Sequence, residues 1–446
     1  MGNDTRDGSP SSAPDVAPLQ PDSPLRLAFD EAFKSDWRAI LKRSGNGRTL
    51  STLENVYHIL IHDENWRSVI GFNEHSCCVV TTKPPPFGAQ ASASEWTDDY
   101  DHHLALWLSI HYGIEPKERV MATAVRTAAD RNRFHPVRQK LAALAWDERP
   151  RLRYWLQAYL GAEPVIYTVD GREVEYTDVV GTKFLVGAVA RVMEPGCKQD
   201  HVLILEGVQG IGKSSAMGVL FDPWCTDQQI KIGEKDTYEV MRGQWVIELP
   251  ELDALSKAEV ASAKAFFSRS RDRFRSFYGR RAATVPRQTV FVGTVNHFQY
   301  LRDASGNRRY WPVRCHRVDL ADLAEEKDQL WAEALHLYRQ GVSWWVLPQE
   351  AAMFQEEQEK RYVGDAWEER IRHWLEEAPQ GQFEPRNECT TSQILSGALG
   401  MDPSKWSHAE QTRVGIVMER IGWPARRPWF DGALRQRVYV RPKRPK

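Results

Sequence analysis

A glycine-rich turn, Gly207–Ser214, constrains the fold of this chain more than any other feature. Its sequence, GVQGIGKS, matches the pattern G-x-x-x-x-G-K-[ST] and lies between the apolar run VLIL and the helix-compatible run SSAMGVL. Strand, turn and helix in this order form a phosphate-binding loop, in which backbone N–H groups and the helix N-terminus point at an anion. We therefore expect nucleotide binding by Gly207, Val208, Gln209, Gly210, Ile211, Gly212, Lys213, Ser214 and Ser215.

The residues after the last glycine of this loop carry the chemistry of a triphosphate site. Lys213 is expected to contact the β- and γ-phosphates, and the Ser214 hydroxyl is expected to bind Mg²⁺. The glycines let the backbone turn so that its N–H groups face inward. ATP and Mg²⁺ are the cofactors that this pattern predicts.

Two acidic residues follow a second predicted strand in the stretch GQWVIELPELD. Glu248 is predicted to stand at the end of that strand, where it can bind Mg²⁺ beside Ser214. Glu251 is a candidate for polarising the attacking water, although an adjacent pair of acids is the commoner spacing. Both could instead be surface glutamates that follow a buried strand.

Further polar candidates lie around a third and a fourth predicted strand. Asn296 ends the run QTVFVGTVN and could hydrogen-bond the γ-phosphate or the attacking water, but asparagine at a strand end is often a turn residue. Arg308 and Arg309 lie in DASGNRRYWPV, after a Gly-Asn turn. Arginine suits the neutralisation of charge on a transferring phosphoryl group, and a surface salt bridge is the alternative.

The near-neutral total charge, with 59 Lys and Arg against 60 Asp and Glu, hides two basic blocks. Residues 256–317 hold 14 Lys and Arg against three acids, and residues 412–446 hold ten against two. Basic residues interleaved with aromatic ones suit a phosphate backbone and stacked bases, although many charge runs are only solvated faces. The stretch DRFRSFYGRRAATVPRQTVFV predicts a hairpin, and DNA is the expected partner of Arg275, Tyr278, Arg280 and Arg281.

Composition divides the chain into five regions. They are a disordered tail (1–24), a mainly helical domain (25–150) with a mixed part around WRSVIGFNEHSCCVV, a helical lead-in (151–200), an α/β domain with the phosphate-binding loop (201–340), and a helical linker with a winged-helix-like module (341–446). In the lead-in, Gly161 is expected to cap the helix RLRYWLQAYLG. In the last region, EEQEKRYVGDAWEERIRHWLEEA is expected to be helical, and a short pair of strands is expected around the turn Asp431-Gly432. The six cysteines include no C-x-x-C pair, which argues against a zinc site and a disulfide framework. Reduced thiols and a cytoplasmic location are therefore expected. No apolar run is long enough to span a membrane.

Four stretches resemble the virulence-associated E family, P-loop proteins of phages, plasmids and genomic islands. They are LAWDERPRL, RVMEPGCKQDHVLILEGVQGIGKSS, GQWVIELPELDALSKAEVASAKAFFSRSRDRFRSFYGRR and VFVGTVNHFQYLRDASGNRRYWPV. The resemblance covers roughly residues 30–375 and implies a fold similar to superfamily 3 helicases, which are AAA+-like ring ATPases. It implies that Lys213 and Ser214 are Walker A, Glu248 Walker B, Asn296 sensor 1, and Arg308 and Arg309 the arginine-finger region. The hairpin around Arg280 resembles one that projects into the central pore of a ring.

The resulting expectation is an ATP-dependent DNA helicase or translocase, assembled as a homo-oligomeric ring, with a hexamer expected, and acting in replication of a mobile element. Relatives often carry a primase domain ahead of this block, but no paired-acid metal motif precedes it here. The alternative is a nucleotide-gated DNA-binding or assembly switch in regulation or phage interference. Such a switch would not need Glu248, Glu251 and Asn296 as a water-activating set. A small-molecule kinase fits less well, because no compact lid or acceptor pocket is evident.

Overall fold

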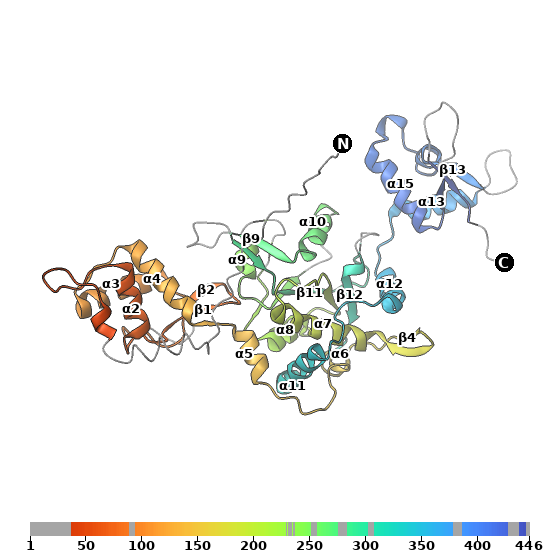
Figure 1. Cartoon of the computed structure of the whole chain (residues 1–446). Helices are drawn as coiled ribbons and strands as arrows, with labels where there is room; N and C mark the ends of the chain where they lie inside the picture. Colours follow the sequence, from red (N-terminus) through yellow and green to blue (C-terminus); the bar gives the residue numbers. More distant parts are fainter. Residues whose placement is uncertain are drawn as a thin grey trace, which may run out of the picture. The chain divides into compact units, whose positions relative to one another are not determined.

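The computed structural model describes residues 37–88, 94–228, 230, 234, 237–250, 257–274, 283–301, 307–377, 386–426 and 437–442 (Figure 1). The predicted disordered tail lies outside these residues. The chain divides into two compact units, one up to His135 and one from Pro136 onward. Among the helices of the described ranges, none combines the length and apolar character needed to cross a membrane.

The first unit combines helices with a small sheet. Its elements are η1 (Trp37–Ile40), α2 (Leu53–His62), β1 (Ile70–Asn73), β2 (Cys78–Thr81), α3 (Asp98–Tyr112), α4 (Glu118–Arg131) and β3 (Arg133–Phe134). β1 pairs antiparallel with β2 and parallel with β3. The core contains the buried indoles of Trp66, Trp96 and Trp107. A region predicted to be mainly helical therefore also contains a β-hairpin, at the segment whose sequence pattern is mixed.

Parallel strands form the central sheet of the second unit. They are β6 (Val202–Glu206), β7 (Cys225–Thr226), β8 (Val246–Pro250), β11 (Val290–Val295) and β12 (Tyr310–Arg314). Their order in space is β12-β6-β11-β8-β7, so β11 lies between β6 and β8. The carboxyl ends of all these strands meet at one edge of the sheet. The predicted α/β class is confirmed for this unit.

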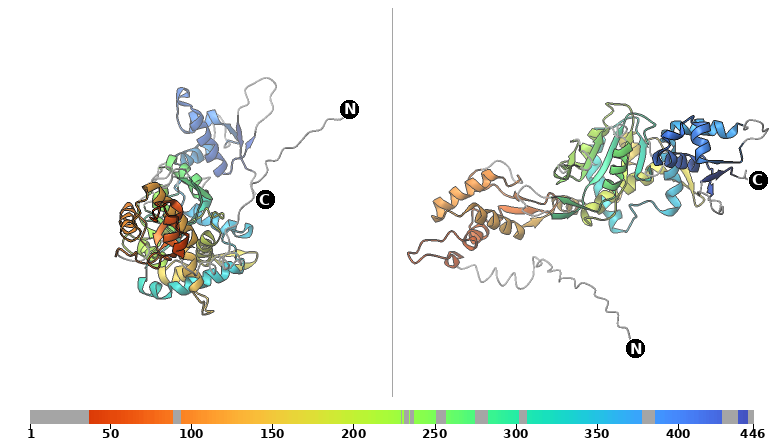
Figure 2. Two further views of the ribbon diagram at one scale, coloured as in Figure 1. Left: turned by 60° about the vertical axis from the view of Figure 1, so that its left-hand side comes forward. Right: turned by 90° about the horizontal axis from the view of Figure 1, so that it is seen from above.

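Helices cover both faces of this sheet (Figure 2). Side chains alternate along a strand, so each strand buries two sets of residues. Leu203 and Leu205 face a core shared with α7, α8 and α11, whereas Val202 and Ile204 face a core shared with α10. The helices are α7 (Tyr176–Met193), α8 (Lys213–Phe221), α9 (Thr237–Met241), α10 (Lys257–Phe267) and α11 (Leu320–Arg339).

The segment ahead of the sheet also packs into the second unit. It comprises α5 (Pro136–Ala143), α6 (Trp155–Leu160), β4 (Ile166–Val169) and β5 (Arg172–Glu175). Val137 and Leu141 of α5 lie in the same core as α7, so this unit begins ahead of residue 150, where composition had placed a boundary. Gly161 ends α6 with a φ of 56°, which agrees with the predicted glycine cap.

The predicted helical stretch EEQEKRYVGDAWEERIRHWLEEA forms two helices rather than one. They are α12 (Ala351–Lys360), preceded by η4 (Pro348–Glu350), and α13 (Ala366–Glu376). One long-range contact and one local cap separate them. Leu301 forms a parallel β-bridge with Tyr362, and the backbone at Tyr362 is therefore extended rather than helical. The side chain of Asp365 then accepts a hydrogen bond from the Trp367 backbone N–H and starts a new helix.

The C-terminal part contains helices and a small antiparallel sheet. Its elements after α13 are β13 (Glu388–Thr390), α14 (Thr391–Gln393), the π-helical turn η5 (Ile394–Ala398), η6 (Pro403–Lys405), α15 (His408–Arg420), β14 (Ala425–Arg426) and β15 (Val438–Val440). The predicted pair of strands is present as β14 and β15. A third strand, β13, pairs with β15 and was not predicted. The turn predicted at Asp431-Gly432 lies outside the described residues.

Candidate functional site

The loop between β6 and α8 has the backbone that a phosphate cradle requires. Gly207, Gly210 and Gly212 have φ values of 153°, 84° and 98°, a region that side chains disfavour. At Gly207 an added Cβ would also lie 2.5 Å from the carbonyl oxygen of Cys315. Glycine is therefore required there for two reasons, conformation and space. α8 begins at Lys213, directly after the last of these glycines.

The Lys213 side chain curls back over this loop. Its Nζ donates to the carbonyl oxygens of Gly207 at 2.6 Å and Val208 at 3.0 Å, and to Oδ1 of Asn296 at 3.3 Å. Lys213 is buried, and this burial lowers the pKa of its amine. Asn296 directly follows β11, as predicted, and is exposed. The structure thus brings these two predicted site residues into contact.

The second predicted cluster forms around Glu248. Its Oε1 accepts hydrogen bonds from the Ser214 hydroxyl at 2.6 Å and from the Thr294 hydroxyl at 2.8 Å. Glu248 is buried, with 3% of its surface exposed. It is the middle residue of β8 rather than its last, because the strand continues alongside β11 as far as Pro250. The prediction of a strand-end position was therefore wrong by two residues, whereas the pairing with Ser214 is present.

Thr294 is a site residue that the sequence reasoning missed. It lies on β11, which places Asn296 at the same edge of the sheet, and it reaches Glu248 on the neighbouring strand. The alternation of side chains along a strand could have predicted it. Residue 294 lies on the same side of β11 as position 296 and faces the side chains of β8 that point toward α8.

A cavity of about 360 Å³ opens beside Ser214 and Glu248. Its lining residues are Ser214, Ser215, Gly218, Asp222, Pro223, Cys225, Asp227 and Glu248. Burial raises the pKa of the Cys225 thiol to about 11. The remaining donors are oxygens, the ligand type that Mg²⁺ prefers, and Mg²⁺ commonly retains several waters. Ser214 and Glu248 therefore fit the predicted magnesium site.

Arg308 and Arg309 are not brought to Lys213. They form η3 (Asn307–Arg309) ahead of β12, and Tyr310 at the start of β12 pairs with Val202 at the start of β6. The phosphate-binding loop follows the other end of β6, which lies about 13 Å away at roughly 3.3 Å per residue. Arg309 donates through Nε to the Ser268 hydroxyl at 3.1 Å, and Arg308 is exposed. Burial is the main cause of the lowered pKa of His201, and both arginines lower it further, which places them near the residue that precedes β6.

The stem of the predicted basic hairpin is present. β9 (Arg271–Phe274) pairs antiparallel with β10 (Ala283–Pro286), and Asp272 of β9 forms a buried, two-pronged ion pair with Arg287 at 2.5 and 2.8 Å. Arg271 and Arg273 on the same strand are exposed. The tip residues Arg275, Tyr278, Arg280 and Arg281 lie outside the described residues, as does Glu251.

No curated protein matches the sequence significantly. The A form apo structure of the NrS-1 C-terminal region is similar with a TM-score of 0.46 and 10% identity, over 87% of this chain and 99% of that one. A second apo structure of that region gives a TM-score of 0.40 and 9% identity, over 83% and 95% of the two chains.

A family model gives the more specific result. The model of the virulence-associated protein E-like domain matches residues 141–363, which are half of the chain. The matched range begins in α5 and ends just after α12, so it contains the whole central sheet, Lys213, Glu248 and Asn296. The chain therefore belongs to the virulence-associated protein E-like family.

Proposed function

We propose that this chain is an ATP-hydrolysing motor that moves along DNA, a helicase or translocase similar to superfamily 3, and acts in replication of a phage, plasmid or genomic island. One observation carries the proposal. Lys213 and Ser214 at the start of α8, Glu248 on β8 and Asn296 after β11 converge at one edge of a parallel sheet. This set combines a phosphate cradle with the carboxylate and amide that hydrolysis needs.

The order of the strands supports an AAA+-like core. β11 is inserted between the strand that leads into the phosphate-binding loop and the strand that carries Glu248. β11 therefore ends between β6 and β8, and Asn296, which directly follows it, accepts a hydrogen bond from the Lys213 amine. A polar group in that position can contact the γ-phosphate and the attacking water together. We infer that Asn296 senses whether the γ-phosphate is present.

Each side chain then has a physical task. Lys213 would exchange its contacts with the Gly207 and Val208 carbonyls for contacts with the β- and γ-phosphates, which are stronger because both partners are charged. Bound Mg²⁺ would neutralise charge on the phosphate oxygens. Ser214 would bind the ion and Glu248 would orient its water shell. Asn296 would hydrogen-bond the γ-phosphate or the attacking water and hold it in line for reaction.

The placement of Arg308 and Arg309 supports an assembly of several copies. In one copy they lie at the end of the sheet opposite to Lys213, too far for either side chain to reach the bound phosphate. A second copy can bring them to that phosphate across an interface. We therefore propose a homo-oligomeric ring, expected as a hexamer, with ATP at each interface and an arginine supplied by the neighbour.

DNA is the proposed track for this motor. Residues 256–317 hold 14 Lys and Arg, and the described stem of the hairpin exposes Arg271 and Arg273. The buried Asp272–Arg287 pair joins β9 to the residue that follows β10 and so stabilises the stem. We propose that the tip contacts a single strand through Arg280, Arg281 and the Tyr278 ring.

A DNA-stimulated ATPase assay combined with native mass spectrometry tests this proposal. We expect ATP hydrolysis that rises when single-stranded or forked DNA is added, together with a defined oligomer that forms with nucleotide. Lys198→Ala is a suitable control, because Lys198 is a surface lysine whose side chain is 79% exposed. Tight ATP binding without any turnover would instead favour a nucleotide-gated switch. Absence of ATP binding would refute both functions.

A further inference from the structure

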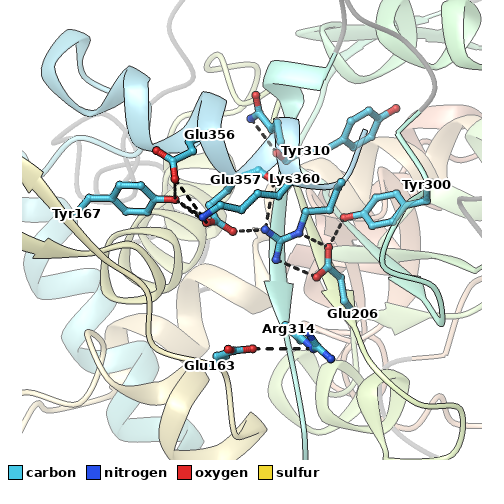
Figure 3. Close-up of polar contacts among 11 residues, drawn as sticks. Glu163, Tyr167, Glu206, Tyr300, Tyr310, Arg314, Glu356, Glu357 and Lys360 are labelled. Atoms are coloured by element: carbon cyan, nitrogen blue, oxygen red, sulfur yellow. Dashed lines mark hydrogen bonds and ion pairs between the residues drawn. The ribbon is translucent and has the colours of Figure 1, made fainter. Parts of the chain in front are cut away.

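A buried network of charges joins the phosphate-binding loop to the chain after α12. Arg361 contacts Glu206 through Nε–Oε1 at 2.8 Å and Nη2–Oε2 at 3.0 Å. Its Nη1 also pairs with the Glu357 carboxylate. The side chains of Arg361, Glu206 and Glu357 are only 5%, 3% and 2% exposed. Figure 3 shows Glu206 and Glu357 within this network, with Tyr300 and Tyr167 at its two ends.

Glu206 occupies a critical place, because it is the last residue of β6 and directly precedes Gly207. Three groups hold it. Arg361 grips its carboxylate, the Tyr300 hydroxyl donates to Oε1 at 2.8 Å, and the Cys315 N–H donates to its carbonyl at 2.7 Å. The orientation of the peptide that leads into Gly207 is therefore set by these contacts. The next carbonyl along the chain, that of Gly207, is the one that receives Lys213.

The backbone of Arg361 makes a second connection. Its carbonyl oxygen accepts hydrogen bonds from the N–H groups of Tyr300 and Leu301, both at 3.1 Å, and Val363 N–H donates to Leu301 at 2.8 Å. Tyr300 and Leu301 belong to the segment that continues from Asn296. Arg361 thus contacts both the strand end that precedes Gly207 and the segment that follows Asn296.

Stability alone does not account for such a network. Buried ion pairs are often replaceable by apolar residues of similar volume without loss of stability, because desolvation of the charges opposes their attraction. Burial accordingly raises the pKa of the Glu206 carboxyl, against the opposing effect of Arg361. What the pair does supply is a fixed direction for Glu206, since a guanidinium that binds a carboxylate through two atoms restricts its orientation.

We propose that Arg361 is a positioning residue of the nucleoside triphosphate site, which acts through Glu206 on the phosphate-binding loop and through Tyr300 and Leu301 on the Asn296 segment. This inference rests on the proposed function, because it assigns a role within the same site. It extends the functional region past the sheet, into a residue that touches no phosphate. Its consequence is that loss of the Arg361–Glu206 pair weakens nucleotide binding even in a folded chain.

The test uses the full chain and three variants. Glu206→Gln/Arg361→Met removes both charges together and leaves Glu357 paired with Lys360 at 2.8 Å and Tyr167 at 2.6 Å, so no buried charge is stranded. Tyr300→Phe removes only one hydrogen bond to Glu206. The control, Lys183→Met/Glu350→Gln, removes a 3.2 Å ion pair of the same unit, whose lysine also bonds the loop carbonyls of Ser343 and Trp345.

Two quantities are measured for each variant, the melting temperature without ligand and the dissociation constant of a fluorescent ATP analogue with Mg²⁺. We expect the Glu206/Arg361 variant to lose about tenfold or more in affinity, the usual effect of removing a group that orients a ligand-binding one. Tyr300→Phe should lose less, and the control should bind like the wild type even if its melting temperature falls further.

The outcomes are distinguishable. Wild-type affinity in both folded Glu206/Arg361 and Tyr300 variants would refute the positioning role and leave the proposed function intact. An affinity that follows the melting temperature across all variants, control included, would also refute it. If the double variant fails to fold, the Tyr300→Phe affinity decides. If the wild-type chain binds no ATP analogue, the proposed function itself fails.

Discussion

The Ser214 hydroxyl and the Glu248 carboxylate lie 2.6 Å apart, although one belongs to the first turn of α8 and the other to the middle of β8. In the proposed Mg²⁺ site, both groups would supply oxygen. They already face each other in the structure, so the ion would need little rearrangement of the protein. The same oxygen of Glu248 also accepts from Thr294, which holds the carboxylate toward α8.

Lys213→Ala should abolish hydrolysis and leave the fold in place. The Lys213 amine contacts loop carbonyls and Asn296 rather than an apolar core, so its removal opens no cavity among the packed side chains. Loss of a charged group that stabilises the transition state lowers a rate by about 10²-fold or more. ATP turnover and thermal unfolding check this, with Lys198→Ala as the matched lysine. Turnover near the wild-type rate would contradict the enzymatic function.

Thr294→Val should slow hydrolysis while ATP still binds. Valine keeps the shape of threonine but removes the hydroxyl that donates to Glu248. Hydrogen bonds to charged groups contribute about 1.5–3 kcal/mol, and such a loss lowers a rate by roughly ten- to a hundredfold. Thr294→Ser, which keeps the hydroxyl, is the control and should retain most of the activity. Equal rates in the two variants would show that this contact does not matter for catalysis.

Arg308→Ala or Arg309→Ala should reduce turnover by about 10³-fold or more with little effect on ATP binding, because a finger acts mainly in the transition state. The proposed supply of this arginine by a neighbouring subunit allows a mixing test. Lys213→Ala subunits combined with Arg308→Ala subunits form some interfaces in which both groups are intact, so activity should partly return. When subunit exchange is demonstrated and no activity returns at any ratio, the simple in-trans model is wrong.

Replacing Arg280 and Arg281 by Ala should weaken binding to single-stranded DNA and leave basal ATP hydrolysis intact. If each arginine contacts one phosphate, the slope of log affinity against log salt should fall by roughly 0.7 per arginine. Arg339→Ala, an exposed arginine of α11, is the control. An unchanged slope would move the DNA path elsewhere, and the basic residues of 412–446 would be the next set to substitute.

Acid should destabilise the second unit through His201. Burial lowers the pKa of His201 to about 4, and the ring stacks on Trp311 with centroids 4.3 Å apart. Below about pH 6.5 the His201 imidazole binds a proton in the unfolded state but not in the folded state. The free energy of unfolding is therefore unaffected above about pH 6.5 and decreases as the pH falls toward about 4. The total decrease is about 3 kcal/mol. Denaturant unfolding at several pH values should show a flatter profile for His201→Phe, which keeps the stacked ring; parallel profiles would refute the assignment.

Local patterns correctly predicted the glycine turn and its flanking strand and helix, because all three are encoded within Val202–Leu220. Asn296 was located because a parallel strand brings its end to the same edge of the sheet. Glu206 and Arg361 are 155 residues apart in the sequence, and no short-range pattern predicts contact between residues so distant. The break between α12 and α13 was missed for the same reason, since pairing with Leu301 overrides a helical sequence.

The opposite placement of Arg308 and Lys213 along one sheet has a consequence for the stoichiometry of assembly. If each active centre needs one group from each of two copies, an isolated copy has no complete centre, and a linear row of copies has one centre fewer than its members. Only a closed ring has as many complete centres as copies. The total rate of ATP turnover should therefore rise more steeply than in proportion to the protein concentration, and dilution should abolish activity under conditions in which the protein stays folded.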